Sequence, residues 1–161
     1  MGKADTAELE KFLQPFTGEI ISVALWLRGF VWDQYPHCNE LIYDNYNAVA
    51  FGWSPTDRLS HVFCSVAVFE KYLHFGFYWG SEIADPEKKL LGKGTQYRYI
   101  KLNNKDEFPV KYMKKLIKEA YANSLAKVKD KTGIIKGQTI VKSISPTKKR
   151  PGSVTAKKKK L

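Results

Sequence analysis

Cysteine and long apolar runs are both scarce in this chain of 161 residues. Its two cysteines, Cys38 and Cys64, are too few for a disulfide framework, and we expect both to be reduced thiols. The longest apolar stretch, residues 20–32, contains Arg28 and is too short to cross a bilayer. Residues 1–14 are charged and lack the apolar core of a secretion signal. These absences predict a cytoplasmic protein without a membrane segment.

Catalytic and metal-binding motifs are lacking as well. The sequence has no Gly-x-Ser-x-Gly element, and no motif pairs His37, His61 or His74 with a nucleophile. His61 and Cys64 lie three residues apart on a predicted strand, where they point to opposite faces and cannot share one ion. The sequence therefore predicts a binding protein that is not an enzyme.

Positive charge is confined to one end of the chain. Residues 1–126 contain 15 Lys and Arg against 15 Asp and Glu, whereas residues 127–161 contain 12 Lys and Arg against one Asp. The whole net charge of +11 thus falls in the second segment. We expect one domain over residues 1–126 and a basic, mostly disordered tail over residues 127–161. The alternative for part of that tail is a weak hairpin in which residues 134–135 pair with residues 139–141 across Gly137.

Hydrophobic periodicity predicts two helices at the start of the domain, one helix at its end and strands between them. Apolar positions at helical spacing mark residues 4–13, 17–34 and 109–125. Stretches rich in β-branched and aromatic residues predict strands over residues 40–43, 48–53, 62–69, 73–79 and 95–102. Because short turn-forming segments connect the strands, we expect an antiparallel meander. The predicted fold is an α+β two-layer sandwich, with the helices packed on a roughly five-stranded antiparallel sheet.

Aromatic residues recur along the predicted strands. In the last strand, alternation places Tyr97, Tyr99 and Lys101 on one face. Core packing accounts for most of the rings, but the Tyr97/Tyr99 face beside Trp53 would suit a small ligand or a stacked base. Without interleaved basic residues, this face would lack the electrostatic part of a nucleic-acid site. The candidate ligand pocket consists of Tyr43, Trp53, Trp79, Tyr97, Arg98 and Tyr99.

A glycine pair precedes that strand. The segment Gly92, Lys93, Gly94 and Thr95 leads into a strand, whereas a Walker loop leads into a helix. It is more simply a turn that needs a positive φ angle. The alternative is an anion held by the amides of these four residues, with Lys93 and Arg98 nearby.

Three motifs together resemble a known family. They are LIYDNYN over residues 41–47, FGWSPT over residues 51–56 and GKGTQYRYI over residues 92–100. In this combination the chain resembles the bacterial YdhG-like domain of unknown function over residues 8–124. Many members carry Gly-Met-Pro where this chain has Asp44-Asn45-Tyr46, and a His where it has Tyr72.

The resemblance implies a frataxin-like fold, and an intracellular role in binding iron or a small ligand, because one member is regarded as a frataxin-like iron chaperone. Weak binding of Fe(II) would use carboxylate oxygens. The candidate metal ligands are Asp5, Glu8, Glu10 and Glu19. The alternative is an ordinary solvated helix face, and a domain without net charge attracts cations poorly.

The tail suggests a function of another class. Clusters of Lys and Arg would neutralise about seven phosphates and give salt-dependent, sequence-independent affinity for nucleic acid or another polyanion. The candidate residues are Lys148, Lys149, Arg150, Lys157, Lys158, Lys159 and Lys160. The alternative is a tail that serves solubility alone.

Overall fold

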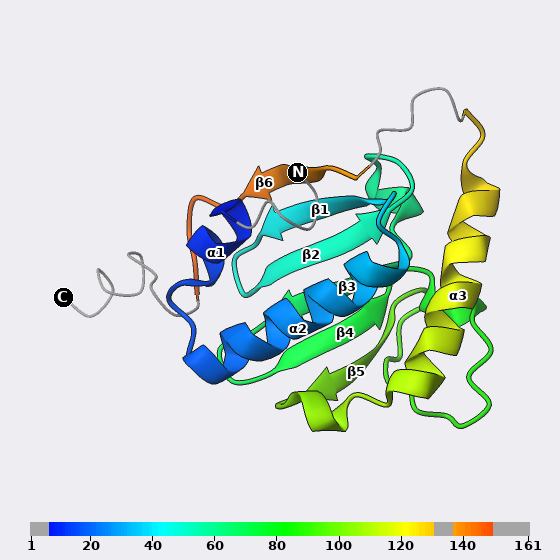
Figure 1. The fold of residues 1–161 in the computed structure, drawn as a ribbon, viewed down its shortest axis with the longest axis horizontal. Coiled ribbons are helices and arrows are strands. Elements are labelled where there is room, and N and C mark those ends of the chain that lie inside the picture. Colours follow the sequence, from blue (N-terminus) through cyan, green and yellow to red (C-terminus); the bar gives the residue numbers. More distant parts are fainter. Residues whose placement is uncertain (1–6, 131–136, 150–161) are drawn as a thin grey trace.

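The computed structural model describes residues 7–130 and 137–149. Within these residues it has three α-helices and one six-stranded sheet (Figure 1). The helices are α1 (Ala7–Leu13), α2 (Gly18–Gln34) and α3 (Val110–Lys127). Helix α2 begins as predicted, because the Thr17 hydroxyl accepts a hydrogen bond from the Ile20 amide at 3.4 Å. None of these helices is long and apolar enough to cross a membrane.

The sheet has the strand order β5-β4-β3-β2-β1-β6. Neighbouring strands from β1 to β5 pair antiparallel, which confirms the meander, but β6 pairs parallel with β1. The sheet is therefore mixed, and the prediction of a purely antiparallel sheet was wrong. The strands are β1 (Asn39–Asp44), β2 (Val49–Ser54), β3 (Cys64–Val68), β4 (Leu73–Phe77), β5 (Arg98–Leu102) and β6 (Thr139–Ile144).

Strand β6 also corrects the expected division of the chain. The segment assigned to a mostly disordered tail contributes this strand, so the sheet extends beyond the boundary expected at residue 126. Disorder was expected because Thr139–Ile144 is short and lies among basic residues. The pairing that orders it is with β1, about a hundred residues away in sequence, where sequence periodicity gives no signal.

All three helices pack on the same face of the sheet. One buried cluster joins Leu13 of α1, Leu27 of α2 and Leu116 of α3 with inward-facing residues of the strands such as Phe51 and Phe75. Figure 1 shows α2 lying in front of the sheet, roughly along the direction of the strands, with α3 beside it. The two-layer α+β arrangement is therefore as predicted. The opposite face of the sheet carries no helix within the described residues.

A buried ion pair fastens α2 to β1. The Arg28 guanidinium donates to both carboxylate oxygens of Glu40, from Nε and from an Nη, at 2.8 Å each. Arg28 is 3% exposed and Glu40 is 0% exposed. The Thr139 hydroxyl of β6 donates a third hydrogen bond to Glu40, at 2.9 Å. Helix α2, strand β1 and the distant strand β6 thus meet at one carboxylate.

A second acidic residue of β1 holds the other end of β6. Lys148 lies 3.1 Å from the Asp44 carboxylate, and the Ser145 amide donates to the Asp44 carbonyl at 2.8 Å. The Lys149 amide then donates to the Tyr46 carbonyl, also at 2.8 Å. The chain therefore stays attached to β1 and to the turn after it as far as Lys149.

We predict that Glu40→Gln lowers the free energy of unfolding by about 3–5 kcal/mol, because it removes the carboxylate charge from a buried ion pair. Replacing both partners, as Arg28→Met with Glu40→Leu, should cost less than Glu40→Gln alone. Urea denaturation measures both effects. The control is Glu87→Gln at the exposed Lys89–Glu87 pair, which should change stability by less than about 1 kcal/mol. Equal losses for Glu40→Gln and Glu87→Gln would contradict the role given to the buried pair.

Candidate functional site

The sheet face without helices carries a central strip of small side chains. Because side chains alternate along a strand, the neighbours of the core residues Phe51, Val66 and Phe75 point to this open face. Strand register aligns two rows of them across the sheet. One row is Ala50, Ala67, His74 and Lys101, and the next is Gly52, Ser65, Gly76 and Tyr99. The surface is therefore depressed at the centre of this face, where small side chains leave space above the sheet.

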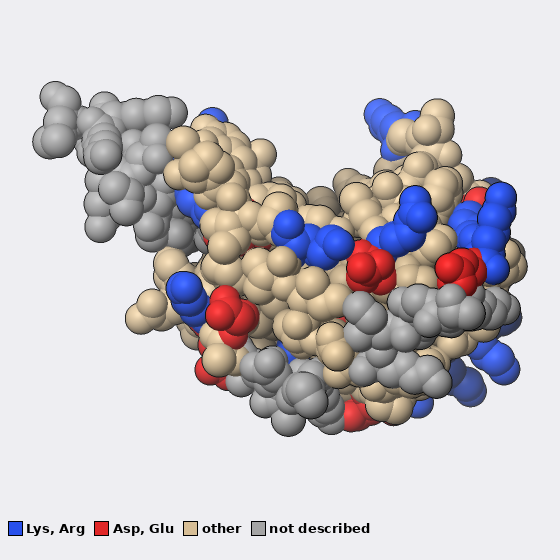
Figure 2. All heavy atoms as spheres, turned by 90° about the horizontal axis from the view of Figure 1, so that it is seen from above, with Lys and Arg blue, Asp and Glu red and all other residues tan. Residues whose placement is uncertain are grey.

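A hollow of about 450 Å³ lies on this face. Its lining includes Ala50, Ser65 and Ala67 as a floor, and its walls include Phe69, His74 and Tyr97. Asn45, Tyr46 and Asn47, from the turn between β1 and β2, complete one end. Figure 2 shows the molecule from above, and on the side away from the helices its surface dips between two raised parts. Hollows of this volume are typical of small-ligand sites.

Five rings form a continuous row beside the hollow, which we call the aromatic ladder. Tyr72 stacks on Phe69 with ring centroids 4.9 Å apart, and His74 lies 5.0 Å from Phe69. His74 stacks on Tyr99 at 4.0 Å, and Tyr99 on Tyr97 at 5.7 Å. All five side chains are partly exposed. Strands β3, β4 and β5, with the residues next to them, thus present one aromatic surface to the solvent.

Lysine residues flank the ladder. The Lys101 ammonium lies 4.4 Å from the centre of the Tyr72 ring, a cation–π contact. A second hollow of about 380 Å³ shares Asn47 and Phe69 with the first, and its lining includes Lys71 and Lys149. The expectation that this face has no interleaved basic residues is therefore wrong.

Tyr97 closes the ladder over Gly76. A Cβ atom at position 76 would collide with the Tyr97 ring, so only glycine lets this ring lie against the sheet. Burial, the neighbouring Tyr99 and a hydrogen bond with Ser65, which acts in the opposite direction, leave the pKa of Tyr97 at about 12. Tyr97 is therefore a neutral, fixed part of the surface at physiological pH.

The structure does not gather the six residues of the candidate ligand pocket. Tyr97 and Tyr99 share the open face as predicted, and Tyr43 alternates with the core residue Ile42. Trp53 has the same parity in β2 as Phe51 and is fully buried under the helices. Trp79 lies beyond β4, and its indole N–H donates to the Ser60 carbonyl at 2.8 Å. Arg98 instead contacts the loop before β5, where it donates to the Gly94 carbonyl.

The segment from Gly92 to Thr95 is a turn of the predicted kind. Gly92 has a φ angle of +125°, which other residues rarely adopt. Arg98 donates from one guanidinium nitrogen to the carbonyls of Gly94 and Tyr97, at 2.7 and 2.8 Å. This arginine therefore stabilises the loop through carbonyl oxygens. Lys93 and Thr95 are exposed, and an anion bound at this turn stays a prediction.

The candidate metal ligands do not come together among the residues that the structure places. Glu8 and Glu10 are exposed on α1, and Glu19 is exposed in the first turn of α2. Asp5 lies outside the described residues. Within residues 7–130 and 137–149, no three His, Cys, Asp or Glu side chains form a group able to hold a metal ion. Burial raises the pKa of Cys38 to about 12 and that of Cys64 well above its ordinary value, which keeps both thiols protonated.

The candidate nucleic-acid residues are divided by the limit of the described chain. Lys148 pairs with Asp44, and Lys149 lines the second hollow. Arg150 and Lys157, Lys158, Lys159 and Lys160 lie outside the described residues. Sequence analysis did not identify Phe69, Tyr72 and His74 as site residues. The alternation of His74 with Leu73 and Phe75 was a usable signal, but its pairing with Lys101 depends on the strand register.

We predict that Lys101→Met raises the pKa of His74. Burial, and then the nearby Lys101 charge, lower this pKa below its ordinary value of 6.5. Titrating the imidazole by NMR measures the change, and Lys118→Met, an exposed change on α3, is the matched control. An unchanged His74 pKa in Lys101→Met would contradict the electrostatic contact.

The same shift has a consequence for stability. Because the folded-state pKa lies below the unfolded one, the unfolded chain binds the proton more readily. The His74 contribution should therefore be constant above pH 6.5 and should decrease stability as the pH falls from 6.5 toward the folded-state pKa.

Comparisons with known proteins give no match for this chain: no protein-family model, no curated protein and no solved structure matches it. Membership of the YdhG-like family and a frataxin-like fold therefore stay predictions from the sequence motifs. The chemistry of the open face is what remains to indicate a function.

Proposed function

We propose that this protein binds single-stranded nucleic acid across the open face of its sheet, without catalysis. The observation that carries the proposal is the aromatic ladder, a row of five partly exposed rings beside a hollow floored by small residues. Aromatic surfaces on open sheets are how several nucleic-acid-binding folds hold unpaired bases.

The hollow suits a flat base. Its floor of Ala50, Ser65 and Ala67 leaves the space open, and rings of Phe69, His74 and Tyr97 bound it. A base in this position gains stacking energy of about 1–3 kcal/mol, whichever base it is. The side-chain amide of Asn47 in the lining is able to donate and accept hydrogen bonds at the base edges.

Positive charge is available along the path of the phosphates. Lys101 lies over Tyr72 at one part of the ladder, and Lys71 and Lys149 line the adjoining hollow. Lys149 also leads into residues 150–161, which contain five more Lys and Arg. Stacking and charge therefore come from neighbouring parts of one surface, as a single strand requires.

The iron-binding role implied by the family resemblance has less support. Glu8 and Glu10 are exposed on α1 and Glu19 on α2, and in the described part of the chain no three acidic, His or Cys side chains form a group able to hold a metal ion. The aromatic face offers rings where a metal ion prefers oxygen ligands.

We predict that Tyr99→Ala weakens binding to a labelled oligo(dT) or oligo(U) by about 1–3 kcal/mol, because a stacking ring is lost. Tyr99→Phe keeps the ring and should keep the affinity. Fluorescence anisotropy measures both. Tyr112→Ala, on α3, is the matched control and should bind like the parent protein. Binding that is unaffected by Tyr99→Ala, or that is equally tight for a blunt duplex, would overturn the proposal.

We predict that a chain ending at Lys149 binds with a shallower salt dependence. Removing five cations lowers the slope of log K against log salt by up to about 3.5, at about 0.7 for each phosphate contact to a single strand. The Tyr99→Ala effect should persist in this shortened chain. An unchanged slope would show that residues 150–161 make no phosphate contacts.

A further inference from the structure

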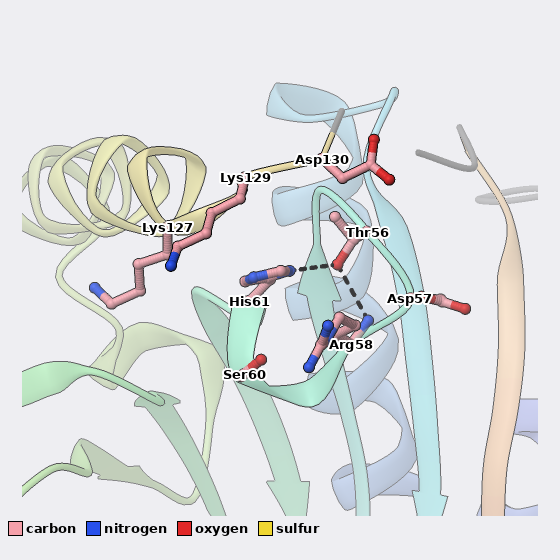
Figure 3. Close-up of a pocket in the computed structure, with 8 residues that line it drawn as sticks. All are labelled: Thr56, Asp57, Arg58, Ser60, His61, Lys127, Lys129 and Asp130. Carbon is pink, nitrogen blue, oxygen red and sulfur yellow. Dashed lines mark hydrogen bonds between the residues drawn. The ribbon is translucent and has the colours of Figure 1, made fainter. Parts of the chain in front are cut away.

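A pocket separate from the two hollows of the open face lies at the other end of β2. It has a volume of about 500 Å³. The connection between β2 and β3 supplies Thr56, Arg58, Ser60 and His61, and the C-terminal end of α3 supplies Lys127 and Lys129 (Figure 3). Thr56 follows β2 directly, whereas the residues of the aromatic hollow begin with the turn before it. The two sites are therefore separate.

Hydrogen bonds around Thr56 fix the shape of this pocket. The Thr56 amide donates to the Ser54 hydroxyl at 3.0 Å, and the Arg58 amide donates to the Thr56 hydroxyl oxygen at 3.1 Å. That oxygen also lies 2.7 Å from Nδ1 of His61. Ser54 and Thr56 are buried, so this loop is held by internal bonds rather than by solvent. Arg58 and His61 are presented from a rigid support.

The pocket is lined by three cationic side chains, Arg58, Lys127 and Lys129, and by two acidic ones, Asp57 and Asp130. Neither the Arg58 guanidinium nor the Lys129 ammonium makes an ion pair with a residue that the structure describes. Lys127 differs, because it lies 2.6 Å from Glu82 and 4.9 Å from the centre of the Trp79 ring. Figure 3 shows Lys129 and Arg58 on two sides of His61, with the Lys127 side chain extending away from it and the Asp57 carboxylate pointing away from the pocket.

We infer that this pocket binds the phosphate group of a small phosphomonoester. Arg58 and Lys129 supply two positive charges, and neither forms an ion pair with the Asp57 or Asp130 carboxylate of the lining, so a phosphate group is able to contact both cations. A guanidinium binds phosphate oxygens with two parallel hydrogen bonds, and an ammonium adds a point charge. The Ser60 hydroxyl is a further donor in the lining, and the volume leaves room for a small organic group beside the phosphate.

His61 serves as an internal reporter of an anion in this pocket. Burial lowers its pKa, as do Arg58 and Lys127, whereas a backbone hydrogen bond with Lys127 and the Asp57 charge raise it. Lys129 and Asp130 complete the charged groups that line the pocket. A bound dianion offsets the positive charges, so it raises the pKa of His61.

The test is a titration of the full-length chain with inorganic phosphate, followed by amide and imidazole NMR signals. Shifts should concentrate at Arg58, Ser60 and His61, and the pKa of His61 should rise on saturation. Arg58→Ala should weaken phosphate binding about tenfold or more, because a charge-assisted hydrogen bond is lost. Lys105→Ala, which removes an exposed cation from another part of the surface, should change nothing. Acetate should bind more weakly than phosphate.

The results separate this inference from the proposed function. Tyr99→Ala should leave phosphate binding unchanged, and Arg58→Ala should leave stacking-dependent oligonucleotide binding unchanged. Absence of localised shifts, an unchanged His61 pKa at saturating phosphate, or equal phosphate affinity in Arg58→Ala would each overturn the phosphate site. A simple phosphomonoester that binds no more tightly than inorganic phosphate would restrict the site to the phosphate group itself.

Discussion

The ion pair between Arg28 and Glu40 is the contact on which the arrangement of this fold depends. Both charges are removed from water, which is costly unless each finds a partner of opposite sign and good geometry. The two-pronged contact at 2.8 Å supplies that partner, and Thr139 satisfies the carboxylate further. In a five-stranded meander β1 would be an edge strand, and the Glu40 carboxylate would lie near solvent. Strand β6 covers that edge, so helix, strand and C-terminal strand depend on one another.

All three helices pack on one face of the sheet, so among the described residues the other face carries no helix and is available for binding. On the helix side, large side chains such as Phe51, Trp53 and Phe75 fill the core. On the other side, the same strands carry Ala50, Gly52, Ser65 and Ala67, which are too small to form a second core. The rings of His74 on β4 and Tyr99 on β5 lie at the margin of this strip of small residues. The difference in side-chain size between the two faces is what makes one a core and the other a surface with a hollow.

Much of the fold follows from local patterns. The helices, the five-stranded meander and the shared face of Tyr97, Tyr99 and Lys101 are all consequences of periodicity along short segments. Trp53 was misplaced because it was grouped with other aromatic residues by type. Its parity with Val49 and Phe51 in β2 indicates the core side. Strand β6 and the contact of His74 with Tyr99 depend on register between distant segments, and one sequence does not reveal register.

The direction of β6 decides at which end of the sheet Lys149 lies. Because β6 runs parallel to β1, it starts near the connection between β2 and β3, where Lys142 donates to the Asp57 carbonyl, and finishes beside the turn at Tyr46. An antiparallel sixth strand would have run the other way and released the following residues at the far end of the sheet. The parallel pairing instead places Lys149 at the end of the sheet that holds the two hollows of the open face.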